Sequence, residues 1–159
     1  MFEQKLNLFD IIVKISLILG LWVSIAWSAA SPVGIWKTVD DETGHVKSLV
    51  EITESSGELK GKIVKLFRKP DEDQDPRCEK CEGDKKDKPI LGLDILWGLK
   101  KDSDAKWSGG EIMDPKKGKI YSCKMEVIDD GKKLRVRGFL GFSLLGRTQT
   151  WERQEELVP

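Results

Sequence analysis

Apolar and polar residues alternate in short runs along the chain after residue 30, with turn-forming residues between the runs. Alternation with a period of two is typical of strands that bury one face. The stretch "IYSCKMEVI" shows it most clearly, because Tyr121, Cys123, Met125 and Val127 fall on one side of it. The sequence "DDGK", which is typical of a hairpin turn, follows directly. No long helical pattern is present in this part of the sequence, so the pattern favours an all-β domain.

The other strand candidates lie between turn sequences such as "DETG", "SSGE" and "DPKKGK". They are "VGIWKTVD", "HVKSLVEIT", "ELKGKIVKLF", "WSGGEIMD", "KLRVRGFLG" and "RTQTWER", whereas "ILGLDILWGL" fits either a strand or a short helix. We predict an antiparallel up-and-down β-barrel of about eight strands, because a closed barrel leaves no strand edge exposed. A β-sandwich is the main alternative. The residues expected to face inward are Trp36, Val46, Val50, Ile52, Tyr121, Met125, Val127, Leu134 and Val136.

One end of the predicted barrel has a candidate plug. In an up-and-down barrel the first and last strands are neighbours. Trp36 lies in the first strand candidate, and Arg147 and Arg153 lie in the last one. We therefore expect Trp36 to pack at the base of the barrel with an arginine guanidinium over its ring. The alternative is that Trp36 is simply a core aromatic residue.

The first 30 residues differ in kind from the rest. The run "IIVKISLILGLWVSIAW" is apolar apart from Lys14 and two serines, and small residues follow it at 28–30. This arrangement predicts a signal peptide over residues 1–30 that forms a helix and is cleaved near Ala30. The barrel domain would then span residues 31–159 and reside in the periplasm or outside the cell. The alternative is an uncleaved N-terminal helix that anchors the protein to the inner membrane, which would be its one membrane contact.

Length and charge narrow the range of functions. The chain of 159 residues suits one domain. It has 27 Lys and Arg against 27 Asp and Glu, so its net charge is zero. Nucleic-acid binding normally requires an excess of basic residues, because the protein must replace counterions on phosphate. We therefore expect no nucleic-acid partner.

Three cysteines raise the question of a metal site, a redox centre or a disulfide. Cys78 and Cys81 are separated by two residues and lie in a charged loop from Arg68 to Pro89. This loop has neither the buried strand before the pair nor the helix after it that are typical of a catalytic Cys-x-x-Cys pair. A zinc site would need Cys123 and His45 to join them. We predict no metal site and a Cys78–Cys81 disulfide that tethers the long loop, with Cys123 as a buried, unreactive thiol. A bond between Cys123 and one of the pair is the alternative.

Four longer stretches carry a resemblance to a known family: "PVGIWKTVDDETG", "CEKCEGDKKDKPILGLDILWGLK", "WSGGEIMDPKKGKIYSCK" and "LRVRGFLGFSLLGRTQTWER". Over Pro32 to Arg153 the chain resembles a family of exported bacterial proteins catalogued as domain of unknown function 2147. The resemblance implies a lipocalin-like periplasmic β-barrel without an assigned enzymatic activity. It implies no particular ligand and no particular binding residues.

The predicted fold leads to two functional hypotheses. Eight-stranded barrels can hold one small ligand, so we expect an apolar or amphipathic molecule, such as a lipid or fatty acid, in the cell envelope. The candidate wall residues are Trp97, Trp107, Tyr121, Met125 and Phe139, with Arg137 as an anion partner or, since it alternates with Val136, an external residue. The alternative is a structural or protein-interaction domain with a filled barrel, which contacts partners through the charged loop or the "GFSLLG" segment. No base, nucleophile and oxyanion site can be assembled, so we expect no enzymatic activity and no cofactor. The sequence leaves the oligomeric state open.

Overall fold

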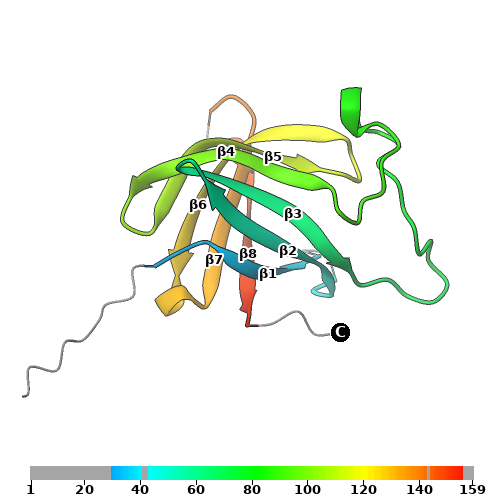
Figure 1. Ribbon diagram of the computed structural model, residues 1–159, viewed down its shortest axis with the longest axis horizontal. Helices are drawn as coiled ribbons and strands as arrows, with labels where there is room; N and C mark the ends of the chain where they lie inside the picture. Colours follow the sequence, from blue (N-terminus) through cyan, green and yellow to red (C-terminus); the bar gives the residue numbers. More distant parts are fainter. Residues whose placement is uncertain (1–29, 41–42, 143, 156–159) are drawn as a thin grey trace, which may run out of the picture.

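The computed structural model describes residues 30–40, 43–142 and 144–155, and in it eight antiparallel strands close into one barrel in chain order (Figure 1). Pairing between the first and last strands completes the ring, with Trp36 opposite Arg153. The predicted eight-stranded barrel is confirmed, and the sandwich alternative is wrong. The predicted signal segment lies, apart from Ala30, outside the described residues. The strands are β1 (Gly34–Val39), β2 (Val46–Ser55), β3 (Glu58–Leu66), β4 (Asp94–Ser103), β5 (Lys106–Asp114), β6 (Lys119–Ile128), β7 (Lys133–Phe139) and β8 (Gly146–Gln154).

The up-and-down order gives the barrel two different ends. The β2–β3, β4–β5 and β6–β7 turns lie at one end, which we call the closed end. The four other connections lie at the open end, and they include the long β3–β4 loop with the short 3-10 helix η1 (Gly83–Lys85). A second 3-10 turn, η2 (Asp129–Gly131), joins β6 to β7. Within the described ranges, no helix is long and apolar enough to cross a membrane.

The inward face of the sheet forms the hydrophobic core. Seven of the nine side chains expected to face inward are buried, while Val46 and Tyr121 are half-buried near the open end. Alternation along β2 places Leu49 on the opposite face from Ser48 and Val50, yet Leu49 is also buried. The β2–β3 pairing shifts register at this point, from Leu49 opposite Lys65 to Val50 opposite Ile63, which leaves Val64 of β3 as the extra residue. The buried predicted residues are Trp36, Val50, Ile52, Met125, Val127, Leu134 and Val136.

Trp36 and Arg153 seal the closed end. The Arg153 guanidinium carbon lies 4.2 Å from the centre of the Trp36 ring. Its nitrogens donate hydrogen bonds to the carbonyl oxygens of Gly131 (2.6 Å), Ser31 (2.6 Å) and Val33 (2.9 Å). The indole Nε1 of Trp36 in turn donates to the Pro32 carbonyl oxygen at 2.7 Å. One arginine therefore ties the chain before β1 to the β6–β7 turn.

The seal between Trp36 and Arg153 explains why a glycine stands at position 34, in the sequence "GIW". Gly34 has a φ of +133°, a conformation that side-chain-bearing residues rarely adopt. A Cβ atom at Gly34 would also lie 2.6 Å from Nη1 of Arg153. Arg147, the other arginine considered for this role, lies opposite Gly138 and lines the open-end cavity instead. The two candidates are therefore at different places along β8.

The charged β3–β4 loop is held by a disulfide between Cys78 and Cys81. Both cysteines are buried, although most of the residues around them are exposed. Backbone bonds close the loop around them, from Cys78 N to Lys88 O at 2.9 Å and from Ile90 N to Pro76 O at 2.9 Å. The loop packs on the β5–β6 turn so closely that a Cβ at Gly118 would collide with the Lys80 backbone. The tether therefore fixes the loop beside the open end.

Candidate ligand-binding cavity

The open half of the barrel contains a large cavity. Its volume is about 1350 Å³, and it opens to solvent between the loops of the open end. The closed half is filled, because Trp36, Leu134 and their neighbours are packed there. This barrel is thus filled at one end and hollow at the other. The apolar residues that line the cavity include Ile63, Leu66, Ile95, Ile112, Met113, Val136 and Trp151.

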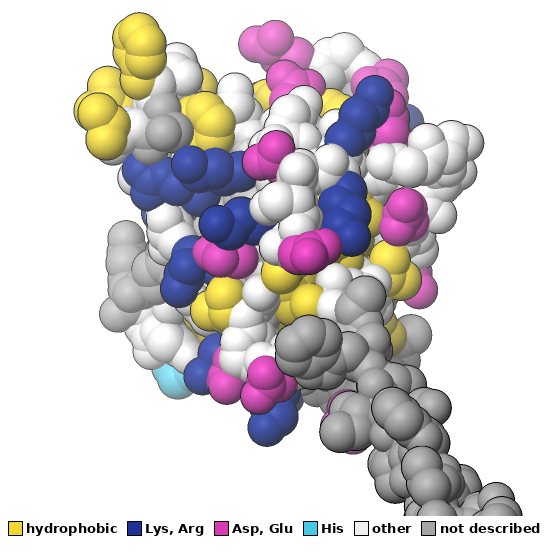
Figure 2. All heavy atoms as spheres, turned by 90° about the vertical axis from the view of Figure 1, so that its left-hand side faces the viewer, with side chains coloured by type: hydrophobic (Ala, Val, Ile, Leu, Met, Phe, Trp, Pro, Cys, Tyr) yellow, Lys and Arg dark blue, Asp and Glu magenta, His cyan; other side chains and the backbone are white. Residues whose placement is uncertain are grey.

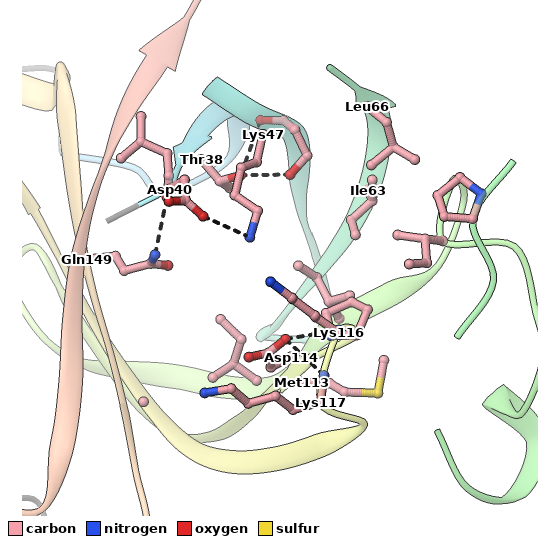
Figure 3. A pocket seen from close by; sticks show the side chains of 18 of the residues that line it. Thr38, Asp40, Lys47, Ile63, Leu66, Met113, Asp114, Lys116, Lys117 and Gln149 are labelled. Carbon is pink, nitrogen blue, oxygen red and sulfur yellow. Dashed lines mark hydrogen bonds and ion pairs between the residues drawn. The ribbon is translucent and has the colours of Figure 1, made fainter. Parts of the chain in front are cut away.

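Three lysines extend into the mouth of this cavity. Lys47 comes from β2, while Lys116 and Lys117 come from the β5–β6 turn. Figure 3 shows their side chains directed towards the cavity interior, opposite the apolar side chains of Ile63 and Leu66. The strands position these lysines because β2 and the β5–β6 turn face each other across the mouth. The arrangement combines an apolar floor with a cationic rim.

The acidic residues of the rim are largely engaged in local structure. Asp114 accepts hydrogen bonds from the backbone N–H groups of Lys116 (3.0 Å) and Lys117 (3.3 Å), which shapes the turn. Asp40 forms an ion pair with Lys47 at 3.6 Å and accepts a hydrogen bond from the Thr43 N–H. Within the part of the chain that the structure describes, no side-chain partner is present for the ammonium groups of Lys116 and Lys117. These two cations are therefore available to a ligand.

The net charge of the cavity lining also favours an anionic ligand. Eight Lys and Arg residues line the cavity against five Asp and Glu residues, so the mouth is positive although the whole chain is neutral. Partly enclosed charges are screened less by salt than exposed ones, so this excess acts on a ligand inside the mouth. An anionic head group at the lysines and an apolar tail on the floor would satisfy both halves of the lining.

The residues predicted as the ligand wall are not brought together. Tyr121 lines the cavity, whereas Trp107 and Met125 are buried in the packed core and are not part of the lining. Trp97 lies on the outer surface, where its Nε1 donates a hydrogen bond to Glu111 Oε2 at 2.8 Å. Phe139 borders both the cavity and an outer groove that contains Trp97.

Arg137 points outward and does not serve the cavity as an anion partner. Its neighbour Val136 pairs with Met125 in the core, so alternation places Arg137 on the outer face. There it donates a hydrogen bond to Thr148 Oγ1 at 2.8 Å. The cations that do face the cavity, Lys116 and Lys117, lie in the "DPKKGK" turn. In the sequence, the only sign of this cationic site is the pair of adjacent lysines in a turn between two strands. The direction of their side chains depends on the folded turn.

Cys123 is a buried thiol on β6. Burial raises the pKa of Cys123 from its ordinary value of 9.0 to about 12. It therefore remains protonated at neutral pH, and a thiol is a much weaker nucleophile than a thiolate. In residues 30–40, 43–142 and 144–155, no group of three or more His, Cys, Asp or Glu side chains could hold a metal ion.

Comparison with known proteins gives a family and a fold. A family model described as "Uncharacterized protein conserved in bacteria (DUF2147)" matches residues 34–153. Among solved structures, the chain is similar to protein HP1028 from Helicobacter pylori, which belongs to the lipocalin family. The TM-score is 0.69 at 19% sequence identity, over 80% of this chain and 85% of that one. A search of curated proteins finds no match.

Proposed function

This chain belongs to the bacterial DUF2147 family, and from that premise and its half-hollow barrel we propose that it is an exported protein that binds one small amphipathic anion. The observation that carries the proposal is the pairing of an apolar floor with the lysines of the mouth. The ligand chain lies against Ile63, Leu66 and Met113, and its carboxylate or phosphate group meets Lys116 and Lys117. The protein acts as a binder and not as an enzyme.

The dimensions of the cavity support a lipid-sized ligand. Sites for small molecules typically measure about 300–1,000 Å³, and the cavity of about 1350 Å³ is somewhat larger. An apolar tail gains from leaving water, by about 0.8 kcal/mol for each buried CH₂ group. The lysines then favour an anion over a neutral head group of the same chain length. This difference makes palmitate and hexadecanol a matched pair of probes.

Titration calorimetry or native mass spectrometry with these two probes tests the proposal. Palmitate should bind in a 1:1 complex and hexadecanol more weakly. The double substitution Lys116→Gln with Lys117→Gln should weaken palmitate binding about tenfold, since each lysine supplies a charge-assisted contact. It should leave hexadecanol binding unchanged. The matched control is Lys100→Gln with Lys101→Gln, which removes the same charge from exposed positions on β4 near the closed end.

A second variant tests the apolar floor. Ile112→Trp places a large side chain in the cavity and should reduce the binding of both probes by a similar factor. Thermal unfolding checks that the variant is folded. If neither probe binds the wild-type protein, and its melting temperature does not respond to a panel of anionic lipids, the alternative of a structural or protein-interaction domain replaces this proposal.

The proposed location in the cell envelope has its own test. The N-terminal residue of the protein recovered from the bacterial periplasm should be Ser31 if the signal peptide is removed after Ala30. Recovery of the intact chain in the inner membrane fraction would favour the uncleaved anchor.

A further inference from the structure

The β7–β8 loop presents large apolar side chains to solvent at the edge of the cavity. Leu144 is 88% exposed, Phe142 83%, Leu145 75% and Leu140 55%. The other large apolar residues exposed in the described structure range from 39% to 53%. We call these four residues of the β7–β8 loop the apolar tip. Exposed apolar clusters of this kind mark interaction sites.

Backbone contacts hold the tip in its exposed form. The Leu140 N–H bonds to the Leu145 carbonyl oxygen at 3.2 Å, and the Leu145 N–H bonds to the Phe142 carbonyl oxygen at 3.1 Å. Arg137 also donates to the Leu144 carbonyl oxygen at 3.4 Å. The turn is therefore closed by its own hydrogen bonds with its apolar side chains directed outward.

The surface below the tip is cationic. Arg137 lies on the outer face of β7, and Lys124 of β6 pairs directly opposite it. Figure 2 shows hydrophobic side chains projecting at the top of the molecule, where Figure 1 places the β7–β8 loop, with Lys and Arg side chains directly below them. The sign of this belt complements an anionic surface.

We propose that the apolar tip inserts into the interfacial layer of an anionic lipid bilayer, with Lys124 and Arg137 meeting the lipid phosphates. A short convex tip cannot bury the roughly 1,200 Å² or more of a stable protein–protein interface. A bilayer accepts such a tip, because a few apolar side chains enter the head-group boundary while nearby cations remain at the phosphate level. The arrangement of apolar residues above a cationic belt matches that layering.

The apolar tip lies next to the mouth of the cavity. Leu140 and Leu145 of the tip line the cavity, and so does Arg147, which follows the tip in the sequence. Docking through the tip would therefore bring the cavity mouth to the bilayer, where an amphipathic anion resides. This consequence for ligand exchange rests on the proposed function, whereas the docking itself does not.

Vesicle co-sedimentation of the barrel domain tests the docking. Residues 1–29 are removed, because the barrel closes within residues 34–154 and an apolar N-terminal segment would bind lipid by itself. The domain should bind phosphatidylcholine vesicles that contain phosphatidylglycerol, and bind pure phosphatidylcholine vesicles weakly. Phe142→Ser with Leu144→Ser should weaken binding by about tenfold or more. Val33→Ser, an exposed apolar residue near the closed end, is the control and should have no effect.

Charge variants and a solution assay complete the test. Lys124→Gln with Arg137→Gln should reduce the preference for phosphatidylglycerol, while Lys100→Gln with Lys101→Gln should leave it intact. Equal vesicle binding by the wild type and the tip variant would overturn the proposal, and so would absence of binding to phosphatidylglycerol vesicles. Dimers that depend on the tip, without vesicle binding, would assign it to a second copy of the chain. Palmitate binding in solution should survive the tip substitutions, so failure of docking and failure of ligand binding are separable.

Discussion

Replacement of Arg153 by alanine should destabilise the barrel by about 3 kcal/mol. Its contact with the Trp36 ring at 4.2 Å contributes about 1–2 kcal/mol, because both groups are partly shielded from water. The hydrogen bond to Gly131 at 2.6 Å is part-buried and contributes about 1 kcal/mol. The two bonds to Ser31 and Val33 are exposed and together add about 1 kcal/mol or less.

Urea and thermal unfolding of the barrel domain measure this loss. A change of about 3 kcal/mol corresponds to a melting temperature lower by roughly 10 °C in a domain of this size. The matched control is Arg135→Ala, which removes an exposed ion pair with Glu126 at 2.7 Å. That pair should contribute less than about 1 kcal/mol. Arg153→Lys should recover less than half of the loss, since an ammonium group cannot reach three carbonyl oxygens at once.

A double-mutant cycle with Gly34 identifies the cause. Gly34→Ala should be strongly destabilising alone, because its Cβ would lie 2.6 Å from Arg153 Nη1. In the Arg153→Ala background the clash is gone, and only the backbone strain at φ +133° remains. The two substitutions should therefore be less than additive. Additive effects, or equal losses for Arg153→Ala and Arg135→Ala, would refute the account of the seal.

Two further predictions concern the cysteines. The double substitution Cys78→Ala with Cys81→Ala should lower the free energy of unfolding by about 2 kcal/mol, which is the loop-closure value for a short loop. In hydrogen-exchange measurements, amides of the tethered loop such as Ile90 should exchange faster, while β6 and β7 stay protected. Unchanged exchange in the loop would contradict the tether. The free energy of unfolding should fall as pH rises above 9, because the folded state keeps the Cys123 proton up to a pKa of about 12 and the unfolded state does not. Relative to Cys123→Ala, the wild type should lose about 2 kcal/mol between pH 8 and pH 10.5, and a constant difference would contradict it.

The sequence by itself determined the class of fold and much of the core. Alternation along "IYSCKMEVI" places Met125 and Val127 on the buried face because a strand directs successive side chains to opposite sides. The paired cysteines in a long charged loop predicted the tether that is present between Cys78 and Cys81. These features depend on local spacing, which can be followed directly along the chain.

The tertiary structure decided which end of the barrel is hollow and which cations face the cavity. Leu49 is buried although alternation places it on the opposite face from Val50, so the period-two pattern alone does not predict its burial. Lys116 lies at the mouth because the shape of the folded β5–β6 turn sets its direction, whereas alternation with the buried Val136 is enough to place Arg137 outside. Packing in the closed half depends on side chains from strands far apart in sequence, such as Trp36 and Arg153. Local spacing sets the face of each strand, but only the closed ring determines what the strands enclose together.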